Sequence, residues 1–213
     1  MAKRILLVTG TPGIGKTTVL KKLVGILQSQ GFQVGGILSQ EVREDGNRVG
    51  FEIIDLGRRK STWLAHVKQT TGPTVGKYRV NLAGLETVGA KAIDDAVQFK
   101  TVIAIDEIGP MELFSLEFVK AVKNAIESSK PVIATIHWKP NRIKKELIAR
   151  TDIEVVEVTP QNRDSLSDII AQKLSCFCPR SLFKPLTKMT QNKLVLCECN
   201  SIVLFKASNK ANV

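Results

Sequence analysis

The sequence is poor in aromatic residues. Phenylalanine, tryptophan and tyrosine together make up 5% of the 213 residues, and there is a single tyrosine. Proteins that bind single-stranded nucleic acid without sequence preference stack bases on aromatic side chains within a basic groove. The basic clusters at residues 57–60 and 142–145 are short and contain no aromatic residue. A dedicated single-strand-binding protein is therefore a poor fit to this composition.

Long hydrophobic runs are also missing. Hydrophobic residues make up 43% of the chain, but no stretch of about 18 apolar residues occurs, so the sequence predicts one globular core and no membrane partner. A chain of this length is too short for two full domains. It begins MAKRILLVTG, whose apolar run is too short for a signal peptide. We therefore expect a cytoplasmic monomer with its main domain at residues 1–178.

Acidic residues are outnumbered by basic ones. The chain has 31 Lys and Arg against 20 Asp and Glu, which gives a net charge of +11 and a pI near 9.6. A surface of this sign attracts polyanions such as nucleotides, nucleic acids or an anionic membrane. A lysine-rich soluble surface without any such partner is the simpler explanation. The charge therefore admits a nucleic-acid partner but does not favour one.

Cysteine is scarce and confined to the C-terminal part of the chain. The four residues form two C-x-C pairs, Cys176 with Cys178 and Cys197 with Cys199. Four thiolates could bind zinc, but structural zinc sites usually have C-x₂-C spacing, so free thiols remain the alternative. A cytoplasmic setting disfavours disulfides. Because the composition changes after residue 178, we treat residues 179–213 as an appendage of unknown role.

The order of apolar runs predicts an α/β fold with a mainly parallel sheet. Strand-like runs alternate with segments in which apolar residues recur at helical spacing. A hairpin around Asp45-Gly46-Asn47 should join two extended segments in residues 32–56. Residues 57–73 show no clear period and read as a long surface loop. The expected strands are 4–10, 75–82, 101–107, 131–138 and 153–159, and the expected helices are 16–31, 85–99, 116–128, 142–150 and 164–175.

The stretch GTPGIGKT at residues 10–17 fits the phosphate-loop pattern G-x-x-x-x-G-K-[ST]. It follows an expected strand and precedes an expected helix, which is the context that the motif requires. Its glycines let successive backbone N–H groups point at phosphate oxygens, and the helix N-terminus adds partial positive charge. Lys16 can neutralise the β- and γ-phosphates, and the Thr17 hydroxyl can bind Mg²⁺. We therefore predict a nucleoside triphosphate site.

Two adjacent acids, Asp106 and Glu107, end the apolar run that starts at Val102. In this kind of fold an aspartate at the end of a neighbouring strand gives the magnesium ion its second protein support, and we assign this role to Asp106. Successive side chains of a strand point to opposite faces, so Glu107 should face differently. An acid there can deprotonate the water that attacks the γ-phosphate, which makes Glu107 the candidate general base. The alternative for Asp106 is a strand-end turn residue, and the alternative for Glu107 is a surface acid or a salt-bridge partner.

Further polar residues are weaker candidates. Thr135 and His137, near the end of the strand expected at 131–138, could touch the attacking water or only satisfy a strand-end hydrogen bond. Glu41 and Arg43 could simply form an ion pair. A second positive group would speed hydrolysis, although a solvated helix face explains each candidate equally well. These basic candidates are Arg142, Lys144, Lys145, Arg150 and Arg163.

Four motifs in order resemble one known family: GTPGIGKTT, GGILSQEVREDGNRVGFEIIDL, VGKYRVNL and AIDEIGPMELFS. This family comprises the P-loop nucleoside-triphosphatases of thermophilic bacteria and archaea and their human relative, cancer-related nucleoside-triphosphatase. The resemblance covers about residues 4–175, and the tail after residue 178 departs from the pattern. It implies a RecA-like or kinase-like P-loop core. It also implies slow, Mg²⁺-dependent hydrolysis of ATP, GTP and other nucleoside triphosphates with little base preference.

Carried over by position, the resemblance gives two nucleotide-contacting segments. The first is Gly10, Thr11, Pro12, Gly13, Ile14, Gly15, Lys16, Thr17 and Thr18, and the second is Val102, Ile103, Ala104, Ile105, Asp106 and Glu107. We expect Lys16 and Glu107 to be catalytic, and Thr17 and Asp106 to hold the metal. Two other functions use the same loop. A small-molecule or nucleotide kinase would pass the γ-phosphate to an acceptor, and an RNA-associated switch would bind RNA through the +11 charge.

Overall fold

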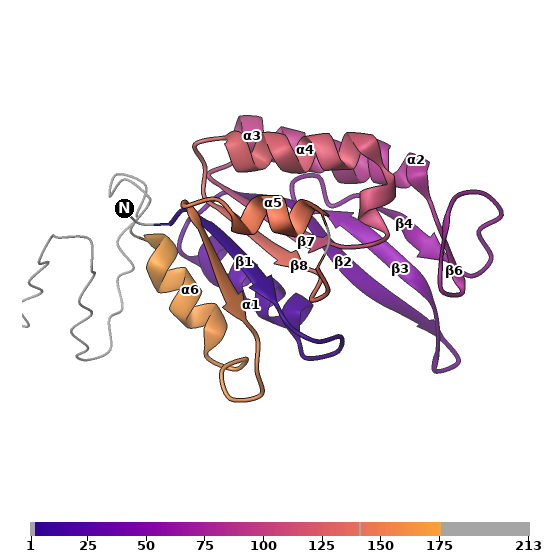
Figure 1. The fold of residues 1–213 in the computed structure, drawn as a ribbon, viewed down its shortest axis with the longest axis horizontal. Coiled ribbons are helices and arrows are strands. Elements are labelled where there is room, and N and C mark those ends of the chain that lie inside the picture. Colours follow the sequence, from indigo (N-terminus) through magenta and orange to yellow (C-terminus); the bar gives the residue numbers. More distant parts are fainter. Residues whose placement is uncertain (1–2, 141, 176–213) are drawn as a thin grey trace, which may run out of the picture.

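A single sheet runs through the computed structural model, which describes residues 3–140 and 142–175 (Figure 1). Within these residues it has nine strands, in the order β5-β6-β4-β3-β2-β7-β8-β1-β9. The strands are β1 (Ile5–Thr9), β2 (Val34–Glu44), β3 (Asn47–Asp55), β4 (Ser61–His66), β5 (Thr74–Val75), β6 (Tyr78–Val80), β7 (Val102–Ile108), β8 (Val132–Ile136) and β9 (Ile153–Glu157).

Helical segments connect the strands. The predicted helices are present, and the segment expected at 85–99 begins earlier, with a short helical turn followed by a π-helix. The helical segments are α1 (Lys16–Ser29), α2 (Leu82–Gly84), the π-helix η1 (Leu85–Ala90), α3 (Lys91–Phe99), the 3₁₀ turn η2 (Glu112–Phe114), α4 (Leu116–Glu127), α5 (Arg142–Ile148) and α6 (Leu166–Ser175). Among these segments none is long and apolar enough to cross a lipid bilayer.

The strands β2, β7, β8, β1 and β9 run parallel, and helices cover both of their faces (Figure 1). Helices α1 and α6 pack on one face, in a cluster that includes Leu6 and Val8. Helices α3, α4 and α5 contribute to the cluster on the other face, which includes Ile5 and Leu7. Because helices cover both faces, the central strands β1, β7 and β8 are nearly continuous buried runs rather than alternating ones. The predicted α/β class with parallel strands is confirmed.

The hairpin of β2 and β3 is also confirmed. Glu44 pairs with Asn47, so Asp45 and Gly46 form a two-residue turn, with φ angles of 47° and 77°. Positive φ at both central residues is what an Asp-Gly hairpin turn provides. The hairpin does not stand apart from the core, because β2 also pairs with β7 on its other side.

The prediction of a long surface loop at residues 57–73 is wrong. Residues Ser61–His66 form β4, which lies between β3 and β6 and pairs antiparallel with both. Leu64 and Ala65 are buried next to each other, so the strand lacks the alternation that marks a half-buried strand in a sequence. Pairing with distant partners, rather than a local pattern, makes this segment a strand.

Several predictions fall outside the described residues. The proposed boundary at residue 178, the appendage at 179–213 and the four cysteines all lie beyond residue 175, the last one described. Their roles stay predictions.

Candidate active site

The phosphate loop connects the end of β1 to the start of α1. Gly13 and Gly15 have φ angles of 78° and 114°, in the left-handed region that favours glycine. A Cβ placed at either glycine would meet no heavy atom within 4 Å, so open space lies beside both. Thr11, Pro12, Gly13 and Thr18 are exposed, Ile14, Gly15 and Thr17 are partly buried, and Gly10 is buried. The loop thus presents backbone at the surface, as a phosphate cradle needs.

Lys16 is buried although it carries a charge. Only 8% of the residue is exposed, and its Nζ donates a hydrogen bond of 3.2 Å to the Gly10 carbonyl. The same Nζ lies 3.9 Å from Oε2 of Glu107. The amine therefore stands between the phosphate loop and the end of β7.

Asp106 is the centre of a buried hydrogen-bond network. Its Oδ1 accepts from the Thr17 hydroxyl at 3.3 Å and from the Thr135 hydroxyl at 2.6 Å. Its Oδ2 accepts from the backbone N–H and the hydroxyl of Ser39, at 3.3 Å and 2.9 Å. Three elements besides β7 therefore hold this carboxylate: α1, β8 and β2.

Glu107 has different partners and a different environment from Asp106. Its side chain is 24% exposed, whereas Asp106 is 1% exposed as a residue. The pKa of Glu107 is raised, mainly by burial and also by the charge of Asp106, while Lys16 opposes the rise. The register of β7 against β8 shifts between Ile105 and Ile108. Regular alternation does not hold here, and the partners alone distinguish the two acids.

The rest of the second predicted segment belongs to the core. Val102, Ile103, Ala104 and Ile105 have no exposed surface, and they are divided between the two hydrophobic clusters. Their side chains cannot reach a ligand at the surface. They fix the position of the two acids that follow them.

The hydrogen bonds of Thr135 and His137 show which of the predicted roles each residue has. Thr135 is fully buried, and its hydroxyl donates to Asp106, so a strand-end hydrogen bond accounts for it. His137 accepts at Nδ1 from the backbone N–H of Lys139. The pKa of His137 is lowered by burial and by neighbouring cations that include Lys16.

Among the basic candidates, Lys144 is the one that reaches the strand ends. Its Nζ donates to the Thr9 hydroxyl at 3.3 Å and to the carbonyls of His137 and Trp138 at 3.0 Å and 2.9 Å. This amine therefore ties α5 to the ends of β1 and β8, next to the phosphate loop.

Most of the remaining charged candidates form ion pairs at the surface. Arg142 pairs with Glu146, Arg163 approaches Asp164 at 4.0 Å, and Lys145 is exposed. Arg150 pairs with Asp152 and Glu127, and Glu41 pairs with both Arg43 and Arg48. An ion pair therefore accounts for Glu41 and Arg43.

Sequence reasoning missed two residues of this site, Ser39 and Glu112. Ser39 looks like an ordinary strand residue, and only the pairing of β2 beside β7 brings it to Asp106. Glu112 is 5% exposed, and its pKa is raised to about 8, mainly by burial and further by the charges of Glu107 and Asp106. Its place between Met111 and Leu113 was the one local hint that this acid is buried.

The oxygen atoms around Asp106 suit a magnesium ion. Mg²⁺ prefers oxygen ligands and is usually bound by one or two carboxylates together with substrate phosphates and water. The Asp106 carboxylate and the Thr17 hydroxyl lie together beside the phosphate loop. Among the residues in the described ranges, no group of three His, Cys, Asp or Glu could hold a metal by itself. The donor set therefore fits a metal that arrives with a phosphate ligand.

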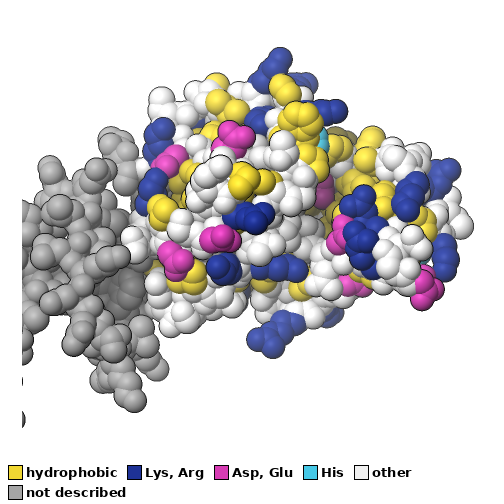
Figure 2. Space-filling view, turned by 90° about the horizontal axis from the view of Figure 1, so that it is seen from below, with side chains coloured by type: hydrophobic (Ala, Val, Ile, Leu, Met, Phe, Trp, Pro, Cys, Tyr) yellow, Lys and Arg dark blue, Asp and Glu magenta, His cyan; other side chains and the backbone are white. Residues whose placement is uncertain are grey.

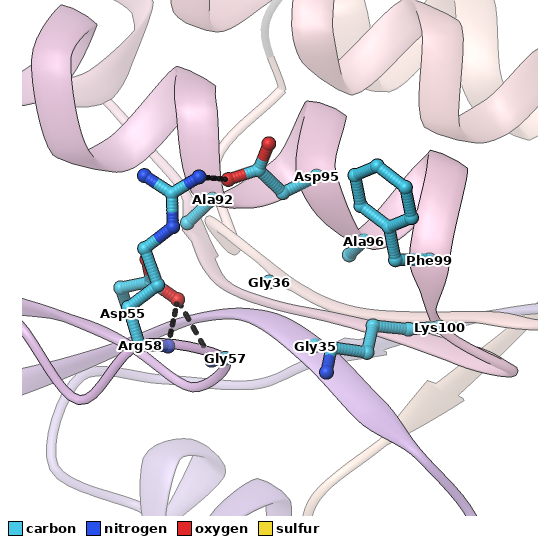
Figure 3. A pocket seen from close by; sticks show the side chains of 10 residues that line it. All are labelled: Gly35, Gly36, Asp55, Gly57, Arg58, Ala92, Asp95, Ala96, Phe99 and Lys100. Carbon is cyan, nitrogen blue, oxygen red and sulfur yellow. Dashed lines mark hydrogen bonds and ion pairs between the residues drawn. The ribbon is translucent and has the colours of Figure 1, made fainter.

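A separate cavity of about 140 Å³ lies away from this site, between α3 and the start of β2 (Figure 3). Oδ1 of Asp55 accepts hydrogen bonds there from the backbone N–H groups of Gly57 and Arg58. Arg58 forms a 2.6 Å ion pair with Asp95. Asp55 is thus held by backbone N–H groups and Asp95 by Arg58, and the residues that line the cavity do not include the phosphate loop.

Comparison with known proteins identifies the family. The sequence model of the NTPase family matches residues 5–171, which is most of the chain. The protein belongs to this NTPase family. The chain is 45% identical over 182 residues to "Nucleoside-triphosphatase THEP1" of Thermofilum pendens, and the match covers 84% of this chain and all of that relative. It is 45% identical over 167 residues to the protein of the same name from Methanosarcina acetivorans, covering 78% of this chain and 94% of that one.

Solved structures of the NTPase family share the fold. The crystal structure of THEP1 from Aquifex aeolicus is similar with a TM-score of 0.69 at 32% identity, over 80% of this chain and 98% of that one. The solution structure of a human cancer-related nucleoside triphosphatase gives a TM-score of 0.72 at 32% identity, over 83% of this chain and all of that one. The resemblance seen in the sequence and the predicted P-loop fold are confirmed.

Proposed function

We propose that the protein hydrolyses the γ-phosphate of nucleoside triphosphates. The observation that carries the proposal is the meeting of Lys16, Asp106 and Glu107 beside the phosphate loop, at the carboxyl ends of the parallel strands. In open α/β sheets, ligands bind outside these strand ends. The names of the relatives, which are 45% identical to this chain, support the same activity.

The chain's own residues suggest how the reaction would proceed. The loop N–H groups and Lys16 would hold the phosphates, and Thr17 and Asp106 would hold Mg²⁺, which neutralises charge on the β- and γ-phosphates when bound. Glu107 would take a proton from the attacking water. Its raised pKa suits this task, because a more basic carboxylate accepts a proton more readily. We accordingly propose Mg²⁺ dependence.

Low base specificity follows from the same contacts. The proposed binding groups are the backbone N–H groups of the loop, the Lys16 amine, and the oxygen ligands of Thr17 and Asp106. All of them would contact phosphate or metal. Such contacts carry no information about the base. We therefore propose that ATP, GTP and other nucleoside triphosphates are all substrates.

The proposal is tested by measuring free phosphate release from ATP, GTP, CTP and UTP in the presence of Mg²⁺. Lys16→Ala should lose nucleotide binding and turnover, while Lys21→Ala, an exposed lysine on the same helix, should behave as the parent. Glu107→Gln should bind nucleotide normally and lose about 10²-fold or more in kcat. A Glu107→Gln variant that hydrolyses at the parent rate would contradict the assignment of the base.

The same assay separates the alternatives. A kinase would release ADP only when an acceptor is added, and without free phosphate. An RNA-associated switch would show RNA-stimulated hydrolysis with strong salt dependence. On the face shown in Figure 2, Lys and Arg side chains are interspersed with Asp and Glu rather than collected into one basic stripe, which does not favour the switch. The cytoplasmic setting and the monomeric state stay predictions.

A further inference from the structure

Glu112 is a buried acid that has no role in the proposed reaction. It lies at the start of η2, the 3₁₀ turn that follows β7, and is 5% exposed. Asp106 is held by four hydrogen bonds, and Asp55, the other acid with so little exposure, accepts two backbone N–H groups away from the site. Burying a carboxyl group costs free energy unless it is hydrogen-bonded or neutral. Glu112 accepts hydrogen bonds from its own backbone N–H and from that of Gly109, but these do not offset its burial, because its pKa stays raised to about 8.

Gly109 brings the Glu112 and Glu107 carboxyl groups to the same small space. A Cβ built on Gly109 would lie 3.0 Å from Oε2 of Glu112 and 3.3 Å from both Oε1 and Cγ of Glu107. Both acids thus lie close to one point, and a side chain at residue 109 would make at least one of them shift by a few tenths of an ångström. The Leu113 N–H donates to the Gly109 carbonyl at 3.1 Å and fixes the turn that carries Glu112.

Glu112 shares this space with Glu107 and is mainly neutral at neutral pH. It is the more deeply buried, and the charges of Glu107 and Asp106 face it from β7, so its pKa of about 8 has a clear cause. Hydrogen bonds from backbone N–H groups of Glu112 and Gly109 oppose the shift without cancelling it. A neutral carboxyl group has an O–H donor, whereas an ionised one can only accept. Neutral Glu112 can therefore donate toward Glu107.

We propose that Glu112 is a positioning residue for Glu107, and that its neutral carboxyl group holds the Glu107 carboxylate at the mouth of the phosphate loop, in the space that Gly109 leaves open. This inference rests on the proposed role of Glu107 in hydrolysis. Glu112 itself touches neither the phosphates nor the attacking water in this scheme. It acts by fixing where the base stands.

Three variants test the inference. Glu112→Gln keeps the shape and a hydrogen-bond donor, so kcat should stay close to that of the parent. Glu112→Leu removes the donor, and kcat should fall about tenfold or more, as part of what a general base contributes, while KM for ATP is unchanged. Gly109→Ala should lower kcat in the same way, because the added methyl group displaces the acids. Glu117→Gln, on an exposed acid of α4, is the control and should match the parent.

A double-mutant cycle supplies a readout that a merely structural role would not give. Adding Glu112→Leu to Glu107→Gln should cause no further loss of kcat, because the residue that Glu112 positions has already lost its function. Binding of a fluorescent ATP analogue should be the same in all variants. A further loss in the double variant, or a parent kcat for Glu112→Leu, overturns the inference.

The outcomes separate this inference from the proposed function. A low rate for Glu107→Gln together with a parent rate for Glu112→Leu overturns the inference alone. A parent rate for Glu107→Gln overturns both. If Glu112→Leu does not fold, the comparison of Gly109→Ala with Glu112→Gln decides, and equal kcat values in these two variants count against the proposal.

Discussion

At the scale of single residues, the site divides its acids by environment. Asp106 is surrounded by hydroxyl groups and a backbone N–H that stabilise it as an acceptor. Glu107 has a nearby cation and some solvent, whereas Glu112 is almost fully buried and accepts hydrogen bonds from backbone N–H groups. Burial thus raises the pKa of Glu107 and raises that of Glu112 to about 8. This is the arrangement by which one site can contain a metal ligand, a base and a proton-bearing neighbour.

The raised pKa of Glu112 makes stability depend on pH in a defined direction. Its folded-state pKa of about 8 lies above the ordinary value of 4.5, so between these values the folded protein binds more protons at this residue than the unfolded chain. The contribution of Glu112 to stability is therefore fully present below about pH 4.5 and is lost as the pH rises through about 8.

The variant Glu112→Gln removes this dependence. We expect the variant to become more stable relative to the parent as pH rises from about 5 to about 8. The free energy of unfolding of the variant minus that of the parent should increase by at most about 1.4 kcal/mol per pH unit. Urea denaturation of both proteins across this range measures the difference. A constant difference between variant and parent would mean that Glu112 is ionised already at low pH.

At the scale of elements, α5 depends on one side chain for its attachment to the strand ends. The helix has seven residues, which is too short to be stable alone in water. Lys144 donates three hydrogen bonds from α5 to Thr9, His137 and Trp138. Leu147 is the buried apolar residue of the helix. The helix is therefore docked by a small apolar contact, by Lys144 beside the phosphate loop, and by an ion pair of Glu146 with Lys123 of α4.

We predict that Lys144→Met loosens α5 without unfolding the sheet. Each lost hydrogen bond should cost about 0.5–1.5 kcal/mol of local stability, so amides of residues 142–148 should exchange with solvent faster, by roughly tenfold or more. Amides of β1 and β8 should keep their protection. The neighbouring variant Lys145→Met removes an exposed lysine and should leave exchange unchanged. Equal exchange in the two variants would show that Lys144 does not anchor the helix.

The sequence predicted those elements whose pattern is local. The phosphate loop, the Asp-Gly hairpin and the continuous apolar strands all have signals within a few residues. The strand β4 has none, because Leu64 and Ala65 are buried side by side and its partners lie in β3 and β6. Ser39 and Glu112 were missed for the same reason. Their place at the site depends on which strand lies next to β7 and on how the chain turns after Gly109.

At the scale of the whole molecule, the strand order assembles the site. Strand β8 lies between β1 and β7, and Thr135 on this middle strand bonds to Asp106. Strand β2 lies on the other side of β7 and brings Ser39 to the same carboxylate. Four parallel strands therefore contribute to one place, since their carboxyl ends meet at one edge of the sheet. No short segment of the chain contains the site by itself.

This assembly leads to a prediction about the C-terminal part of the chain. Every proposed site residue lies within residues 3–175, and the match to the NTPase family ends at residue 171. A chain that ends at residue 178 should therefore fold and should release phosphate from ATP with the kcat of the full chain. Steady-state kinetics and thermal unfolding of the two proteins side by side measure this. A loss of kcat at unchanged thermal stability would show that residues 179–213 act in the reaction, and a loss of both would show that the domain boundary lies further along the chain.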